Sequence, residues 1–119
     1  MRYLLAIHTD EAAESKVNPE EQAKVWQAYV KYTDDLKNAG VLIGGEPLLP
    51  SAHGTKVRVR NGKRSVVDGP FSEAKEVLGG YYVLECKSLQ EASEWAARCP
   101  GAAHGTLEVR QIMDMPKEQ

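Results

Sequence analysis

The sequence has only two cysteines, Cys86 and Cys99, and their spacing does not form a C-x-x-C motif. Two such residues provide no disulfide framework, and a reducing cytosol would keep them as thiols. No apolar run approaches the ~20 residues that a membrane helix needs, and the N-terminal segment reaches Asp10 and Glu11 too early for a signal-peptide core. We therefore expect a cytoplasmic protein without a membrane-spanning segment.

The chain also lacks a strong charge of one sign. Fifteen basic and seventeen acidic side chains give a net charge of −2, so no overall field would attract nucleic acid or anionic lipid. The three histidines, His8, His53 and His104, lack the i, i+4 spacing of a helical metal pair, and we expect neither a metal site nor a cofactor. With 119 residues, 42% of them hydrophobic, the chain has the composition of one globular domain spanning residues 1–119.

Two amphipathic helices are predicted. Asn18 followed by Pro19 is a helix start, and Gly40 is a helix stop. Ser88 and Glu91 form a capping box for a second helix, which ends before residues 100–101. The buried stripe of the first helix is predicted to consist of Ala23, Trp26, Val30, Thr33 and Leu36, and that of the second of Ala92, Trp95, Ala96 and Cys99.

Apolar alternation predicts strands at residues 3–7, 41–43, 79–86 and 105–113. The dipeptide Asn61-Gly62 between two further extended runs predicts a β-hairpin with a type I′ turn, in which Val59 is opposite Arg64 and Val57 is opposite Val66. The resulting order, with the hairpin inserted, is that of a ferredoxin-like α+β fold: an antiparallel sheet with two helices on one face. The other face would expose apolar residues, so we expect a homodimer in which two sheets cover each other.

The stretch VVDGPFSEAKEVLGGY, residues 66–81, resembles the signature of the DGPF proteins, a branch of the YCII-related family. Nearly the whole chain shares the resemblance, which further rests on residues 3–5, 19–21, 39–42, 44–46, 95–100 and 105–110 and on Tyr32. It implies a bacterial, cytoplasmic dimeric α+β barrel. Some members of the family resemble enzymes of the muconolactone-isomerase type, whereas others are encoded beside, or fused to, extracytoplasmic-function sigma factors.

The resemblance thus leaves two functions open. One is small-molecule binding in the barrel, with acid/base chemistry if the protein is an enzyme; the other is an accessory or regulatory module that associates with a sigma factor. Related proteins carry a histidine in the first helix that is paired with an aspartate, but residues 26–32 contain no histidine, and Tyr29 or a neighbour takes its place. That catalytic pair cannot be transferred to this chain. Arg110 is followed by Gln111 instead of the proline usual in DGPF proteins, which favours a longer last strand.

Asp68 and His104 are the candidate catalytic residues, because carboxylates on a loop and histidines can transfer protons near neutral pH. The candidate ligand-binding residues are Glu73, Tyr81, Glu108 and Arg110. Each also has a structural interpretation. Residues 68–71 could form a tight turn in which Gly69 takes a positive φ and Phe71 anchors the loop in the core, Glu108 and Arg110 could form an ion pair, and Tyr81 could be a core residue.

A basic segment follows residue 55 of this mildly acidic chain. Five cations lie within nine residues: Lys56, Arg58, Arg60, Lys63 and Arg64. No aromatic residue is interleaved with them and no recognition helix follows, so direct nucleic-acid binding is not expected. An exposed hairpin kept in solution by its charge, or a docking surface for an acidic protein, fits this pattern better.

Overall fold

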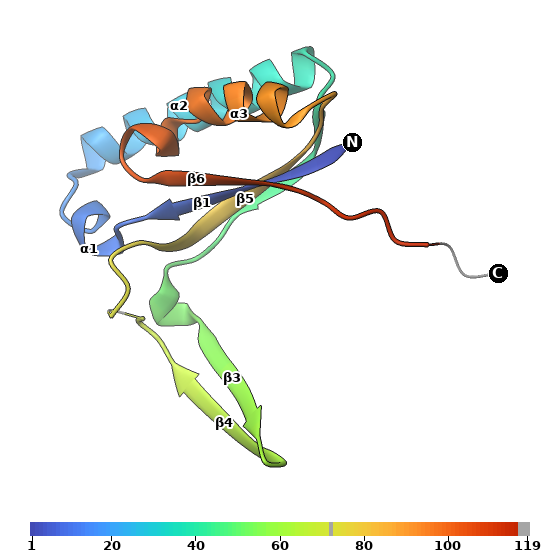
Figure 1. Cartoon of the computed structure of the whole chain (residues 1–119). Coiled ribbons are helices and arrows are strands. Elements are labelled where there is room, and N and C mark those ends of the chain that lie inside the picture. The colour runs from blue at the N-terminus through green and yellow to red at the C-terminus, as the bar shows by residue number, and fades with distance from the viewer. Residues whose placement is uncertain (72, 117–119) are drawn as a thin grey trace.

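The computed structural model describes residues 1–71 and 73–116, and its centre is a four-stranded antiparallel sheet with the strand order β2-β5-β1-β6 (Figure 1). The strands are β1 (Arg2–Thr9), β2 (Leu42–Pro47), β5 (Val77–Glu85) and β6 (Thr106–Gln111). Helices α2 (Pro19–Asn38) and α3 (Leu89–Arg98) lie together on one side of this sheet. The predicted α+β architecture with an antiparallel sheet is confirmed.

The remaining elements are short. They are α1 (Glu11–Glu14), the 3₁₀ turns η1 (Ser51–His53) and η2 (Pro100–Ala103), and the strands β3 (Thr55–Arg60) and β4 (Lys63–Asp68). Helix α1 was not predicted; the Asp10 side chain caps it by accepting a hydrogen bond from the backbone N–H of Ala13. Among the described residues, no helix is long and apolar enough to cross a membrane.

Helix α2 begins and ends as predicted, but it buries a different face. The side chain of Asn18 accepts from the N–H of Glu21 at 2.9 Å, and Gly40 has φ +73° just beyond the helix. Trp26 and Val30, however, are 63% and 48% exposed, and Ala23 is exposed too. The predicted buried stripe is therefore wrong at these three positions, and the helix packs through Tyr29, Tyr32, Thr33 and Leu36.

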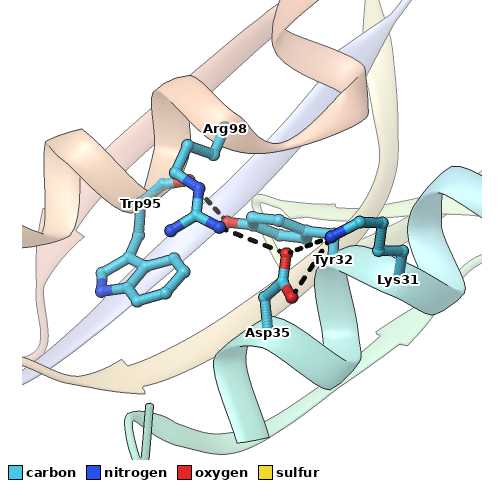
Figure 2. A network of polar contacts seen from close by, with 5 residues as sticks. All are labelled: Lys31, Tyr32, Asp35, Trp95 and Arg98. Atoms are coloured by element: carbon cyan, nitrogen blue, oxygen red, sulfur yellow. Dashed lines mark hydrogen bonds and ion pairs between the residues drawn. The ribbon is translucent and has the colours of Figure 1, made fainter. Parts of the chain in front are cut away.

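Polar contacts explain this orientation (Figure 2). The hydroxyl of Tyr32 donates to the backbone carbonyl of Trp95 at 2.7 Å, which joins α2 to α3, and the Tyr82 and Thr33 hydroxyls share a hydrogen bond of 2.8 Å. Tyrosine buries a large ring once its hydroxyl has a partner, so these residues displace the apolar Trp26 from the interface. At the edge of the same interface, Arg98 stacks over the ring of Trp95 and pairs with Asp35 at 3.2 Å.

Strand β2 is longer than predicted. It continues through Gly44 and Gly45 to Pro47. A Cβ at Gly45 would clash with the carbonyl of Tyr81 and the ring of Tyr82, so the pairing of β2 with β5 requires glycine at this position. Pro47 is tolerated since β2 is an edge strand. Strand β6 runs past Arg110 to Gln111, which pairs with Tyr3, and the Ile112 N–H donates to the carbonyl of Arg2 at 2.8 Å. The last strand thus continues beyond the position at which DGPF proteins usually have proline, although it ends two residues before the predicted residue 113.

Strands β3 and β4 form a separate two-stranded sheet that projects from the body of the molecule (Figure 1). Asn61 and Gly62 have φ values of +53° and +74°, and the pairs Val57–Val66 and Val59–Arg64 lie in the predicted register. All twelve residues of the two strands are exposed. The hairpin is therefore confirmed as an insertion that contributes nothing to the core of the protomer.

Candidate functional site

A hollow of about 660 Å³ opens where the end of β1 meets the segments before β3 and after β4. Its wall is mainly apolar and also carries imidazole, ammonium and carboxylate groups. The lining residues are His8, Leu48, Leu49, Pro50, Ser51, His53, Gly54, Lys56, Phe71, Ala74, Glu76, Val77 and Leu78. The hollow thus lies between the sheet and the loop that carries the DGPF motif.

The motif loop is built around Ser51. The Glu11 carboxylate accepts hydrogen bonds from the Ser51 N–H and hydroxyl, both at 2.6 Å, and the Ser51 hydroxyl oxygen in turn accepts from the N–H of Phe71 at 3.1 Å. The backbone of Gly69 lies so close to that of Ser51 that a Cβ at residue 69 would clash with the Ser51 carbonyl oxygen. The expectation of a positive φ at Gly69 is wrong: among described glycines only Gly40 and Gly62 have one, and Gly69 is required for close approach instead.

Phe71 lies in the wall of the hollow rather than in the core. Its ring is half-buried, and the ammonium of Lys56 is 4.2 Å from the ring centroid. Lys56 also pairs with Glu73 across 3.7 Å, and both of these side chains are exposed. The predicted anchoring of the loop in the core is therefore corrected, because the ring faces the hollow and packs beside Gly54.

The face of the sheet opposite the helices carries a row of polar side chains. The strand register places Tyr81 and Glu108 on either side of Ala6, and the Tyr81 hydroxyl donates to the carboxylate of Glu46 at 3.4 Å. The two oxygens of Glu108 lie 3.5 Å from His8 Nε2 and 3.7 Å from Arg110 Nε. Since His8 also lines the hollow, it connects the open sheet face to the hollow.

The predicted site residues therefore fall into separate places. Glu108 and Arg110 are paired, and Tyr81 shares their sheet face. Glu73 lies beside the hollow through its contact with Lys56. Asp68 is exposed at the base of the hairpin, opposite Thr55, and His104 is exposed after η2; neither is among the described residues that line the hollow. Ser72 of the motif lies outside the described residues.

Five polar residues in the described part of the chain line the hollow, and none of them was predicted as a site residue. His8 and His53 were considered only as metal ligands, and Lys56 only as part of the basic segment. Ser51 lies in a segment without a recognised motif, and Glu76 was not among the candidates within residues 66–81. The carboxylate of Glu76 accepts from the Thr106 hydroxyl at 2.8 Å, which fixes it at the start of β6. The sequence signal that could have identified His8 was its position: it directly follows the first predicted strand, and polar residues in loops beside strand ends are often functional. Within residues 1–71 and 73–116, no group of three or more His, Cys, Asp or Glu residues is placed to hold a metal ion.

Comparison with known proteins identifies a relative with a similar sequence, a solved structure with a similar fold and a matching family model. A protein of Rhizobium meliloti (strain 1021), described as uncharacterized, is 32% identical over 114 residues, which are 94% of this chain and 92% of the relative. A solved structure with a similar fold is 5-chloro-2-hydroxyhydroquinone dehydrochlorinase (TftG) from Burkholderia phenoliruptrix AC1100 in complex with 2,5-dihydroxybenzoquinone. The TM-score is 0.55 with 16% identity, over 95% of this chain and 94% of that one. The sequence model of the YCII-related domain matches residues 1–116, and the chain therefore belongs to the YCII-related family.

Proposed function

We propose that this protein binds a small cyclic molecule in the hollow beside the DGPF loop. The observation that carries the proposal is the composition of the wall, in which Leu48, Leu49, Phe71 and Leu78 surround a few polar groups. Small-molecule sites typically have this composition and volumes of about 300–1,000 Å³. The fold neighbour TftG was solved in complex with 2,5-dihydroxybenzoquinone, and this small cyclic ligand in a similar fold supports a small cyclic occupant here.

If the bound molecule is a substrate, His8 is the group best placed for proton transfer. It lines the hollow, and Glu108 lies 3.5 Å from its Nε2. A carboxylate in this position orients the imidazole ring, as a proton-transfer pair requires. Asp68 and His104, proposed from the sequence, stay candidates that the same experiment tests.

The test is a screen of small cyclic compounds, including 2,5-dihydroxybenzoquinone, against the ¹⁵N-labelled full chain. We expect at least one compound to shift backbone amides at residues 48–54 and 74–78. His8→Gln should change the binding or turnover of that compound, while the fold, monitored by the remaining amide signals, stays the same. Effects of Asp68→Asn or His104→Gln that equal or exceed that of His8→Gln would restore the roles proposed from the sequence. A screen in which no compound shifts these amides contradicts the proposed function.

We further propose that the protein is a homodimer whose subunits cover each other's open sheet faces. Leu4 and Val83 are half-buried on that face, and the valines of the exposed hairpin are 53–60% exposed. A two-stranded hairpin is marginally stable by itself, so packing against a second copy would stabilise it.

Light scattering at micromolar concentration should give twice 13.1 kDa. Val83→Lys places a charge in the proposed interface and should shift the mass toward that of one chain. Val30→Lys is the matched control, because Val30 is 48% exposed on the outer side of α2. A compact monomer for the parent protein, or dissociation by both variants, contradicts this arrangement.

A second candidate function is that of an interaction module, which the charge of the hairpin favours. Lys56, Arg58 and Arg60 alternate along β3 with Val57 and Val59, so the cations share one face of the hairpin, together with Lys63 opposite Arg60. Such a face suits an acidic protein partner. Association with a sigma factor stays a prediction from the family resemblance.

A further inference from the structure

We propose that the occupant of the hollow is an anion with a flat apolar ring, such as an arene carboxylate. This inference rests on the proposed function, since it names the ligand class for the same hollow. Two features must be explained together: an apolar wall open to water, and the position of the Lys56 ammonium beside the ring of Phe71.

The apolar wall of the hollow is the reason for proposing a ligand with a flat ring. Leu48, Leu49 and Leu78 are 45%, 73% and 46% exposed, so large aliphatic side chains around the hollow are in contact with water. A flat ring lying against these residues and the half-buried Phe71 would remove this surface from water. Apolar burial would then supply most of the affinity, independently of charge.

The polar groups in the wall of the hollow are the reason for proposing an anionic ligand. Lys56, His8 and His53 contribute N–H donors to the wall, whereas Glu76 is its only carboxylate among the described lining residues and already accepts from the Thr106 hydroxyl. The present partner of Lys56 is Glu73, at 3.7 Å, with side chains that are 45% and 76% exposed. Exposed ion pairs of this kind are weak, so a ligand carboxylate held in the hollow can replace Glu73 as the partner of Lys56.

The position of Lys56 fixes how the two parts of the ligand are arranged. Its Nζ lies over the ring of Phe71, 4.2 Å from the centroid, so the cation is in direct contact with the apolar wall. A carboxylate attached directly to a ring can reach Nζ while the ring remains against Phe71. A long flexible chain between ring and acid is not needed, and it would lose conformational entropy on binding.

The experiment titrates the ¹⁵N-labelled full chain with four probes of similar size or charge: benzoate, neutral benzamide, cationic benzylamine and ring-free acetate. We expect benzoate to shift the amides of Gly54, Ala74 and Leu78, with a Kd about tenfold lower than that of each other probe. Lys56→Gln should weaken benzoate binding by about tenfold and leave benzamide binding unchanged. Lys63→Gln is the matched control, since it removes the same charge beside the turn of the same hairpin, and it should change neither.

The outcomes separate this inference from the proposed function. If benzamide or benzylamine binds as tightly as benzoate, or if Lys56→Gln affects benzoate and benzamide equally or not at all, the hollow is a small-molecule site but the assigned ligand class is wrong. If acetate binds as tightly as benzoate, the ligand does not need the proposed aromatic ring, and that part of the assignment is wrong. If none of the four probes shifts the lining amides but a compound of the wider cyclic screen does, the ligand class is wrong and the small-molecule site stands. If no compound of either set shifts them, both the ligand class and the proposed small-molecule site are overturned.

Discussion

Gly69 and Ser51 show how single residues shape the hollow. The Gly69 N–H donates to the carbonyl of Gly54 at 2.9 Å, and the space where a Cβ would stand is occupied by the carbonyl oxygen of Ser51. Glu11 holds Ser51 from the other side through two short hydrogen bonds. The motif loop is therefore positioned by backbone contacts with η1, and a side chain at residue 69 would separate the two segments.

Gly69→Ala should lower the free energy of unfolding by about 1–3 kcal/mol, because backbone atoms must move to admit the methyl group. Gly44→Ala is the matched control: a Cβ there meets nothing within 4 Å, and its φ is not positive, so we expect a change within about 0.5 kcal/mol. Urea titrations of both variants measure the difference. Equal effects of the two substitutions would contradict the close approach at Gly69.

At the scale of secondary-structure elements, α2 and α3 are joined by one buried and one exposed polar contact (Figure 2). Tyr32 is 3% exposed, and its hydroxyl donates to Trp95 in the last turn of α3, where helix carbonyls lack intrahelical partners. The ion pair of Arg98 with Asp35 is largely in solvent, since the Arg98 side chain is 55% exposed. The buried hydrogen bond should therefore contribute more to stability than the ion pair.

Tyr32→Phe should cost about 1–3 kcal/mol, because it leaves the Trp95 carbonyl without this donor in a buried interface. Arg98→Met, which retains an apolar stem over the Trp95 ring, should cost less than about 1 kcal/mol. Chemical denaturation of the two variants under identical conditions gives the comparison. The reverse order of the two effects would show that the exposed network dominates the contact between the helices.

At the scale of the whole molecule, the core between helices and sheet contains several weak acids that burial keeps protonated. Burial raises the pKa of the Tyr29, Tyr32 and Tyr82 hydroxyls above the ordinary value, and for Tyr29 and Tyr32 the neighbouring Cys99 adds to the shift. The Cys99 thiol, whose pKa is also raised by burial, faces the same core. These groups come from α2, β5 and the end of α3.

Because the folded-state pKa of each group lies above its unfolded value, the unfolded chain loses protons first as the pH rises. The stabilisation is fully present below the unfolded values, about 8.5 for Cys and about 10 for Tyr, and is lost above them. We expect the free energy of unfolding to fall between pH 8.5 and pH 11, approximate limits set by those values. Urea titrations across this range measure the slope, and Tyr82→Phe should make it shallower. A stability that is constant or rises over this range would contradict the buried, protonated core.

Short-range signals in the sequence were sufficient for the order of elements. The Asn18 cap, the Gly40 stop and the Asn61-Gly62 turn act through neighbouring backbone atoms, so their outcome does not depend on distant parts of the chain. The same locality explains the correct hairpin register. Helix α3 was predicted with its buried side because its only apolar stripe contains Ala92, Ala96 and Cys99, all buried.

Only the tertiary structure decided which face α2 buries and which residues surround the hollow. Helix α2 has two apolar stripes, and the choice depended on hydroxyl partners for Tyr32 and Tyr82 from other elements. His8, Ser51 and Phe71 come from three distant segments of the sequence, and they line one hollow because the strand pairing and the contact of Gly69 with Ser51 bring these segments together. Long-range contacts of this kind leave no periodicity or spacing in the sequence, so the sequence identified the motif loop beside the hollow but not the other residues that line it.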